Sequence, residues 1–138
     1  MALVAEASTV ELAAAVRALG SPGFREMRPA ETGLVMVRGR IGGDGAPFNA
    51  GEATVTRAAV RLESGAAGFS YVLGRDPDKA TLGAVIDAIV ASGAGDAVEK
   101  AFGAAIAARL SSERALAAER TAATRVDFFT LVRGEDQP

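Results

Sequence analysis

Residues 24–74 alternate between apolar and polar positions with a period of two, the pattern typical of β-strands. In the clearest run, Thr54, Thr56, Ala58, Val60 and Leu62 fall on one side of the strand and the residues between them fall on the other. Three or four such runs follow one another with short connections. This order predicts an antiparallel meander rather than parallel strands joined by helices. The expected strands cover about residues 24–28, 33–41, 51–63 and 68–74.

The glycine-rich stretch at residues 42–45 (GGDG) joins the second and third of these runs. It predicts a hairpin turn, because glycine adopts positive φ without steric cost. A phosphate cradle is the alternative. However, the stretch lacks the Lys-Ser/Thr pair of a phosphate-binding loop, and no helix is expected to begin after it. The turn is the interpretation that the residue types favour.

Helical patterns lie on both sides of the strand region. Ser8 and Glu11 form a capping-box pattern, which predicts a helix over about residues 9–19. Asp76 followed by Pro77 predicts the start of a second helix over about 77–91, with apolar residues recurring at the helical spacing.

The region after Gly93 consists of helix-forming residues as far as Thr124. The apolar register slips near Ser111 and Ser112, so we expect two helices, over about 96–110 and 112–124. Residues 126–132 then change to Val, Thr and paired Phe, which favours an extended C-terminal segment. These elements predict one α+β domain over residues 1–138, with helices packed on an antiparallel sheet of three or four strands.

Composition narrows the possible functions. The 138 residues include no Cys and no His, and the formal net charge is −2. The chain therefore has no thiolate ligand for zinc or an iron–sulfur cluster, no cysteine nucleophile and no imidazole base.

Nothing in the charge suggests binding to nucleic acid. No apolar run reaches the roughly 18 residues of a membrane span. We expect a soluble, cytoplasmic protein that contacts neither nucleic acid nor a membrane.

One cluster of polar residues falls on the most regular expected strand. Glu52, Thr54 and Thr56 share one face of it, and Arg57 points to the other. These side chains could form a solvated sheet face, or they could contact a partner subunit or an anionic substrate. The residues leave both interpretations open. Asp76 and Asp78 could hold Mg²⁺, but helix capping already explains them and no metal site is assigned.

A second cluster lies in the expected C-terminal segment. Phe128 and Phe129 are consecutive, so an extended chain sends them to opposite faces, and one of them needs a surface outside this domain's core. Arg125 and Arg133 bracket the pair, and arginine is suited to forked contacts with carboxylate or phosphate. Partner contacts and solvated arginines both remain open.

Several motifs, taken in order, resemble one known family. They are Ala-Glu-Thr-Gly-Leu at 30–34, Arg40, Gly42-Gly43, Phe48, Gly-Glu-Ala-Thr-Val-Thr-Arg-Ala at 51–58, Gly-Arg-Asp at 74–76, and Arg-Val-Asp-Phe-Phe-Thr-Leu-Val-Arg-Gly at 125–134. Together they cover most of the chain. This sequence resembles the PhnG family, the small G subunit of the bacterial carbon–phosphorus lyase complex of phosphonate catabolism.

The resemblance implies a role within an assembly. In that family G, H, I and J subunits form a cytoplasmic core complex of two copies each. The G, H, I and L components together support a transferase step in which an alkylphosphonate displaces adenine from MgATP. The product is α-D-ribose 1-alkylphosphonate 5-triphosphate. The J subunit later breaks the carbon–phosphorus bond by iron–sulfur and S-adenosylmethionine radical chemistry.

The resemblance gives no residue-level role to this chain. It implies a non-radical subunit that is inactive alone, holds no cofactor by itself and meets MgATP as a substrate of the complex. Whether any of its residues is catalytic stays open. Two other classes also remain: a non-catalytic adaptor of another assembly, and a stand-alone nucleotide-dependent enzyme that uses carboxylates and Mg²⁺.

Overall fold

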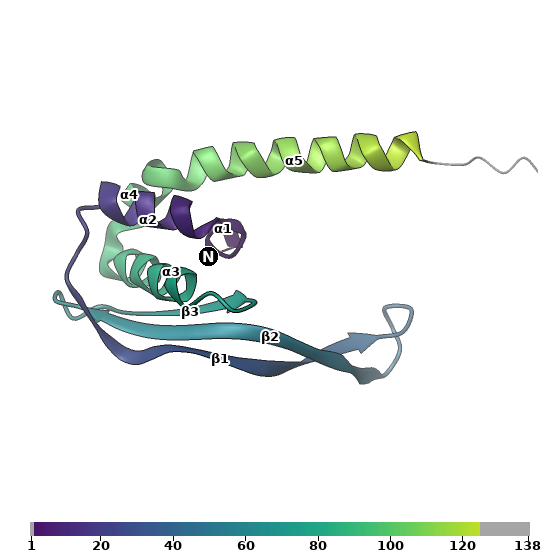
Figure 1. Cartoon of the computed structure of the whole chain (residues 1–138), viewed down its shortest axis with the longest axis horizontal. Helices are drawn as coiled ribbons and strands as arrows, with labels where there is room; N and C mark the ends of the chain where they lie inside the picture. The colour runs from purple at the N-terminus through teal and green to yellow at the C-terminus, as the bar shows by residue number, and fades with distance from the viewer. Residues whose placement is uncertain (1, 125–138) are drawn as a thin grey trace, which may run out of the picture. The chain divides into compact units, whose positions relative to one another are not determined.

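The chain folds into a three-stranded antiparallel sheet with helices. The structure is a computed structural model and describes residues 2–124. The strands β1 (Phe24–Arg40), β2 (Pro47–Leu62) and β3 (Ala67–Leu73) lie in the order β1-β2-β3 (Figure 1). Contacts divide the chain into two compact units, the first ending at Ala107 and the second beginning at Ala108. The α+β class and the meander are confirmed. A single domain over the whole chain stays a prediction.

β1 corrects one expectation. Residues 24–28 and 33–41 were expected as separate strands with Pro29 between them, but they form one strand of 17 residues. The register against β2 shifts on both sides of Arg28, before it from Glu26 and after it toward Glu31, and shifts again between Val37 and Arg38. Proline lacks a backbone N–H, and a strand at the edge of a sheet tolerates that loss.

The connection between β1 and β2 is the expected hairpin. Gly42 and Gly43 adopt positive φ, at 63° and 85°. The Gly45 N–H donates to the Ile41 carbonyl at 3.1 Å and closes the turn. The third strand, expected over 51–63, corresponds to β2, which begins four residues earlier at Pro47 and ends at Leu62.

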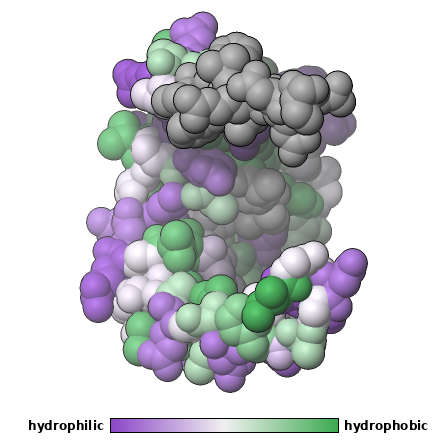
Figure 2. All heavy atoms as spheres, turned by 90° about the vertical axis from the view of Figure 1, so that its right-hand side faces the viewer, coloured by the Kyte–Doolittle hydropathy of each residue, from purple (hydrophilic) through white to green (hydrophobic). Residues whose placement is uncertain are grey.

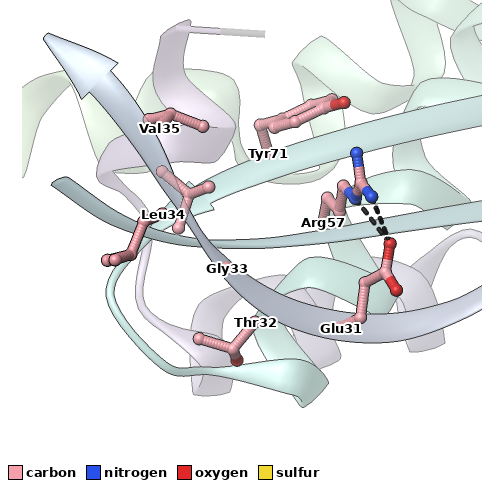
Figure 3. Close-up of a pocket in the computed structure, with 8 residues that line it drawn as sticks. Glu31, Thr32, Gly33, Leu34, Val35, Arg57 and Tyr71 are labelled. Carbon is pink, nitrogen blue, oxygen red and sulfur yellow. Dashed lines mark hydrogen bonds and ion pairs between the residues drawn. The ribbon is translucent and has the colours of Figure 1, made fainter. Parts of the chain in front are cut away.

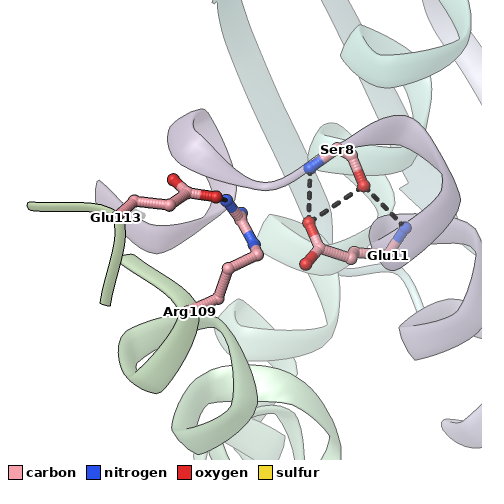
Figure 4. A network of polar contacts seen from close by, with 4 residues as sticks. All are labelled: Ser8, Glu11, Arg109 and Glu113. Carbon is pink, nitrogen blue, oxygen red and sulfur yellow. Dashed lines mark hydrogen bonds and ion pairs between the residues drawn. The ribbon is translucent and has the colours of Figure 1, made fainter. Parts of the chain in front are cut away.

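Two helices precede the sheet in the sequence. α1 (Ala2–Glu6) has no counterpart among the expected helices, whereas α2 (Thr9–Ala18) matches the expected one. The capping box is present: the Ser8 hydroxyl accepts from the Glu11 N–H, and the Glu11 carboxylate accepts from the Ser8 N–H at 2.7 Å (Figure 4).

The helical region after β3 is interrupted between the helices expected over 77–91 and 96–110, as the sequence predicted. α3 (Pro77–Ile89) leads through the π-helical turn η1 (Val90–Ala94), α4 (Gly95–Val98) and a second π-helical turn, η2 (Glu99–Gly103), into α5 (Ala104–Ala123). The break occurs at Gly93, where φ is 93°.

The break expected at Ser111 and Ser112 was wrong. α5 continues through both serines, which are exposed. The Arg109 guanidinium pairs with Glu113 one turn later at 2.8 Å and spans this position (Figure 4). Exposed serines inside a helix cost little, so helix-forming neighbours decide the outcome. The expected extended segment at 126–132 lies outside the described residues.

α3 packs on one face of the sheet, against β2 and β3 (Figure 1). Its buried face is made largely of small residues, including Ala80, Ala84 and Ala88. At Gly68 in β3 the helix approaches so closely that a Cβ would overlap the backbone of Ala84 and Ala88. Small residues on both sides therefore set the distance between helix and sheet.

A buried threonine joins the sheet to the start of α3. The Thr56 hydroxyl donates to the Gly74 carbonyl at 2.7 Å and accepts from the Asp76 N–H at 3.2 Å. Asp76 in turn caps α3 by accepting from the Lys79 N–H at 2.8 Å, and it accepts from the Thr9 hydroxyl at 2.7 Å. These hydrogen bonds hold the pKa of the Asp76 carboxyl below its ordinary value, the one from Lys79 contributing most.

One helical run, Pro77–Ala123, is long and apolar enough to cross a membrane by length and composition alone, judged over the described residues. Its most apolar window is 39% buried inside the protein. The core helices of soluble proteins meet the same criteria, so this is weak evidence for a membrane span. Gly93 also interrupts the run.

Replacing Gly68 with Val should destabilise the fold by about 1–3 kcal/mol or more, because the new side chain would meet α3 backbone that cannot move aside. Gly33→Ala is the matched control, since a Cβ there would have no neighbour within 4 Å. Urea denaturation of both variants tests this. A Gly68→Val midpoint equal to that of wild type would contradict the close packing.

Asp76 should make stability depend on pH in the acid range. Because its folded pKa is lowered, its contribution is fully present above its unfolded pKa of about 4 and is lost as the pH falls through the folded value. Asp76→Ala should cost about 0.5–2 kcal/mol at neutral pH. Asp76→Asn keeps an acceptor but cannot titrate, so its urea midpoint should approach that of wild type as the pH falls. Asp78→Asn is the control, and parallel curves for wild type and Asp76→Asn would refute the assignment.

Candidate functional site

The sheet face opposite α3 carries the candidate site. In β2, Val55 and Arg57 alternate with the buried Thr56 and therefore point away from the helix. Residues directly opposite one another in neighbouring strands share a face. Gly33 and Glu31 of β1, and Leu73 and Tyr71 of β3, are the opposite partners of these two residues, so all six belong to this outer face.

An ion pair lies at the centre of the outer face. The Arg57 Nε and Nη2 atoms both contact Glu31 Oε1 at 2.6 Å (Figure 3), and Arg28 Nη1 reaches the same oxygen at 3.0 Å. The contacts with Arg57, and to a lesser extent the charge of Arg28, lower the pKa of the Glu31 carboxyl. Glu31 is therefore a carboxylate at neutral pH and is not available as a proton donor.

Tyr71 completes the polar part of the site. Contact with the Tyr71 hydroxyl, followed by that with Glu31, raises the pKa of the Arg57 guanidinium. The Tyr71 side chain is 62% exposed, so its ring is available to another molecule. A cation held between a carboxylate and a phenol is fixed in position, which suits recognition of a polar group.

A hollow of about 210 Å³ surrounds these groups. Its rim comes mainly from β1 and β2, with Tyr71 from β3, and combines polar and apolar groups (Figure 3). It is lined by Glu31, Thr32, Gly33, Leu34, Val35, Val55, Arg57 and Tyr71. No three carboxylates among residues 2–124 come together in a way that could hold a metal ion. The arrangement is suited to binding rather than to acid–base or metal chemistry.

The structure separates the polar residues that the sequence grouped on one strand. Thr56 is fully buried and its hydroxyl is used inside the fold, where it also pairs with Thr32 at 3.1 Å. Thr54 is half-buried, and Glu52 is exposed opposite Met36, well away from Glu31. Of the four, Arg57 alone belongs to the outer-face site.

The sequence did not single out Glu31 as a site residue, although it lies in the motif at 30–34. The signal was available in principle: once β1 and β2 pair antiparallel, Glu31 comes opposite Arg57. To place Glu31 opposite Arg57 one must know the register between β1 and β2, and the irregular pairing around Pro29 hides that register from the sequence. Arg125, Phe128, Phe129 and Arg133 lie outside the described residues, so their proposed contacts stay predictions.

The exposed ion pair should contribute little to folding. Glu31→Gln is expected to leave the thermal midpoint of the free chain close to that of wild type, because exposed pairs are solvated and screened by salt. Glu113→Gln, which removes the exposed partner of Arg109, is the matched control. A large loss of stability in Glu31→Gln alone would show that the cluster supports the fold rather than binding.

Comparison with known proteins agrees with the fold and the motifs. The pattern of the family described as "Phosphonate metabolism protein PhnG" matches residues 1–134. The chain is also 53% identical over 137 residues to the alpha-D-ribose 1-methylphosphonate 5-triphosphate synthase subunit PhnG of Rhizobium meliloti (strain 1021). That alignment covers 99% of this chain and 88% of the relative. The chain belongs to the PhnG family of phosphonate metabolism.

Proposed function

We propose that this chain is the G-type subunit of a phosphonate ribosyl-triphosphate synthase. With H-, I- and L-type subunits it supports the formation of α-D-ribose 1-alkylphosphonate 5-triphosphate from MgATP and an alkylphosphonate, with release of adenine. The observation that carries this proposal is the 53% identity, over nearly the whole chain, to a relative named as a subunit of such a synthase.

The chemistry of the chain supports a role within an assembly. It has no His and no Cys, and the one carboxylate at the centre of the outer face is neutralised by two arginines. The hollow beside it, at about 210 Å³, falls below the usual 300–1,000 Å³ of small-molecule pockets. On this proposal MgATP is a substrate of the complex, and this chain contributes surface to the complex rather than a complete active site.

The same residues help to judge the two alternative functions, a stand-alone nucleotide-dependent enzyme and an adaptor of another assembly. A stand-alone Mg²⁺-dependent enzyme would hold the metal on its own carboxylates, and no group of three or more comes together among residues 2–124. An adaptor of an unrelated assembly would share the surface but not the substrate. The resemblance to the PhnG family implies that the J-type subunit breaks the carbon–phosphorus bond, and this chain has no thiolate to ligate an iron–sulfur cluster. We place the assembled complex, with its I-, H- and J-type partners, in the cytoplasm.

Reconstitution tests the proposal. The purified chain alone should release no adenine from MgATP in the presence of methylphosphonate, and neither should a mixture of H-, I- and L-type subunits without it. Adding the chain to that mixture should restore release. The readout is adenine separated by liquid chromatography. Turnover by the chain alone would favour the stand-alone enzyme, and full activity without the chain would rule out the proposed role.

A further inference from the structure

The β1–β2 hairpin extends well beyond the rest of the sheet. β3 pairs with β2 only from Arg61 to Val55, whereas β1 and β2 remain paired from Leu34↔Thr54 to Arg40↔Pro47. Residues 34–54 therefore form a two-stranded ribbon without a third strand (Figure 1). We refer to residues 34–54 as the arm.

Exposed apolar residues lie on both faces of the arm. Leu34 and Met36 lie on one face, with exposures of 61% and 53%, and Val35 and Val37 lie on the other, with 40% and 44%. Figure 2 looks toward the end of the arm, and hydrophobic side chains are open among polar ones in its lower part. A lone two-stranded hairpin is marginally stable in water at best. The exposed apolar residues of the arm are therefore suited to contact with another protein surface.

We propose that the arm inserts into a groove of a different subunit of the same synthase, which covers both of its faces with apolar side chains and places acidic side chains beside Arg38. This inference rests on the proposed function, since it takes the chain to be one of several unlike subunits. Contact with a flat partner would cover one face only. Apolar residues on both faces therefore favour insertion between two surfaces.

The charges of β1 favour an unlike partner over a second copy. β1 contains four arginines and two glutamates. Two copies meeting at their free β1 edges would bring together strands with the same net positive charge, which is unfavourable. Arg38 makes no ion pair within residues 2–124, and Arg40 Nη1 donates only to the Gly45 carbonyl, at 3.1 Å. Acidic groups on the partner would satisfy both arginines.

A shortened arm gives the most direct test. Val35 and Ala53 are directly opposed, so replacing residues 36–52 with Asn-Gly forms a two-residue hairpin turn between them. The variant keeps the pairing with β3 and the Glu31–Arg57 site. It should melt at or above the wild-type temperature as a free chain. After co-expression with the I- and H-type subunits, recovery of the assembled complex by size exclusion should fall at least tenfold.

Point variants separate loss of apolar contact from loss of the arm. Met36→Gln with Val37→Thr changes one exposed residue on each face, and should also lower recovery of the complex about tenfold. The matched control is Val10→Thr with Leu116→Gln, which changes two exposed apolar residues outside the arm. This control should assemble as wild type does. For the charge, Arg38→Glu should weaken assembly and the exposed Arg114→Glu should not.

The outcomes distinguish this inference from the proposed function. If wild type assembles and the shortened arm assembles equally well, the arm is not the docking element, and the proposed function is unaffected. If wild type neither assembles nor supports adenine release, both ideas are wrong. If the free wild-type chain is a dimer in sedimentation experiments and shortening the arm makes it monomeric, the arm's partner is a second copy, and the unlike subunit is ruled out.

Discussion

The close approach of α3 to β3 determines how the first unit, which ends at Ala107, is built. It is possible because Gly68 has no side chain and because Ala84 and Ala88 face it from the helix. Asp87, beside Ala88, adds a polar contact by accepting from the Phe69 N–H at 2.9 Å. The strand is thereby held both by contact with the helix and by a hydrogen bond. Helix and sheet meet over small residues, so little room remains between them for large side chains.

This constraint decides which face of the sheet is free. In β3 the small residues Gly68 and Ser70 face α3, with Val72, and the large side chains of Phe69, Tyr71 and Leu73 turn outward. The outward three are 57–78% exposed. They flank the Glu31–Arg57 pair, so the outer face combines large exposed side chains with charged ones. Aromatic residues and arginine are enriched at interfaces, and this face carries both.

The sequence predicted the elements better than it predicted their exposure. Alternation and capping residues located the sheet, α2 and α3, because those signals are local. Alternation within the expected strand 68–74 puts Phe69, Tyr71 and Leu73 on a common face, but the sequence does not tell which face a helix covers. That depends on the packing of Gly68 against Ala84, residues 16 positions apart. The same limit applies to Glu31 and Arg57, which meet only through a register that an irregular strand conceals.

The distribution of large side chains connects the fold to the proposed assembly. Five aromatic residues lie within the described part of the chain, and of these Phe102 alone is buried, while Phe24, Phe48, Phe69 and Tyr71 are 43–62% exposed. A fold that buries alanine and valine and exposes its aromatic residues gains less stabilisation from apolar burial in its own core than its composition allows. The remaining apolar area is available for contacts with other molecules. In a subunit of a larger synthase, that area can stabilise the complex, so the small-residue core and the exposed aromatic face are two consequences of the same packing.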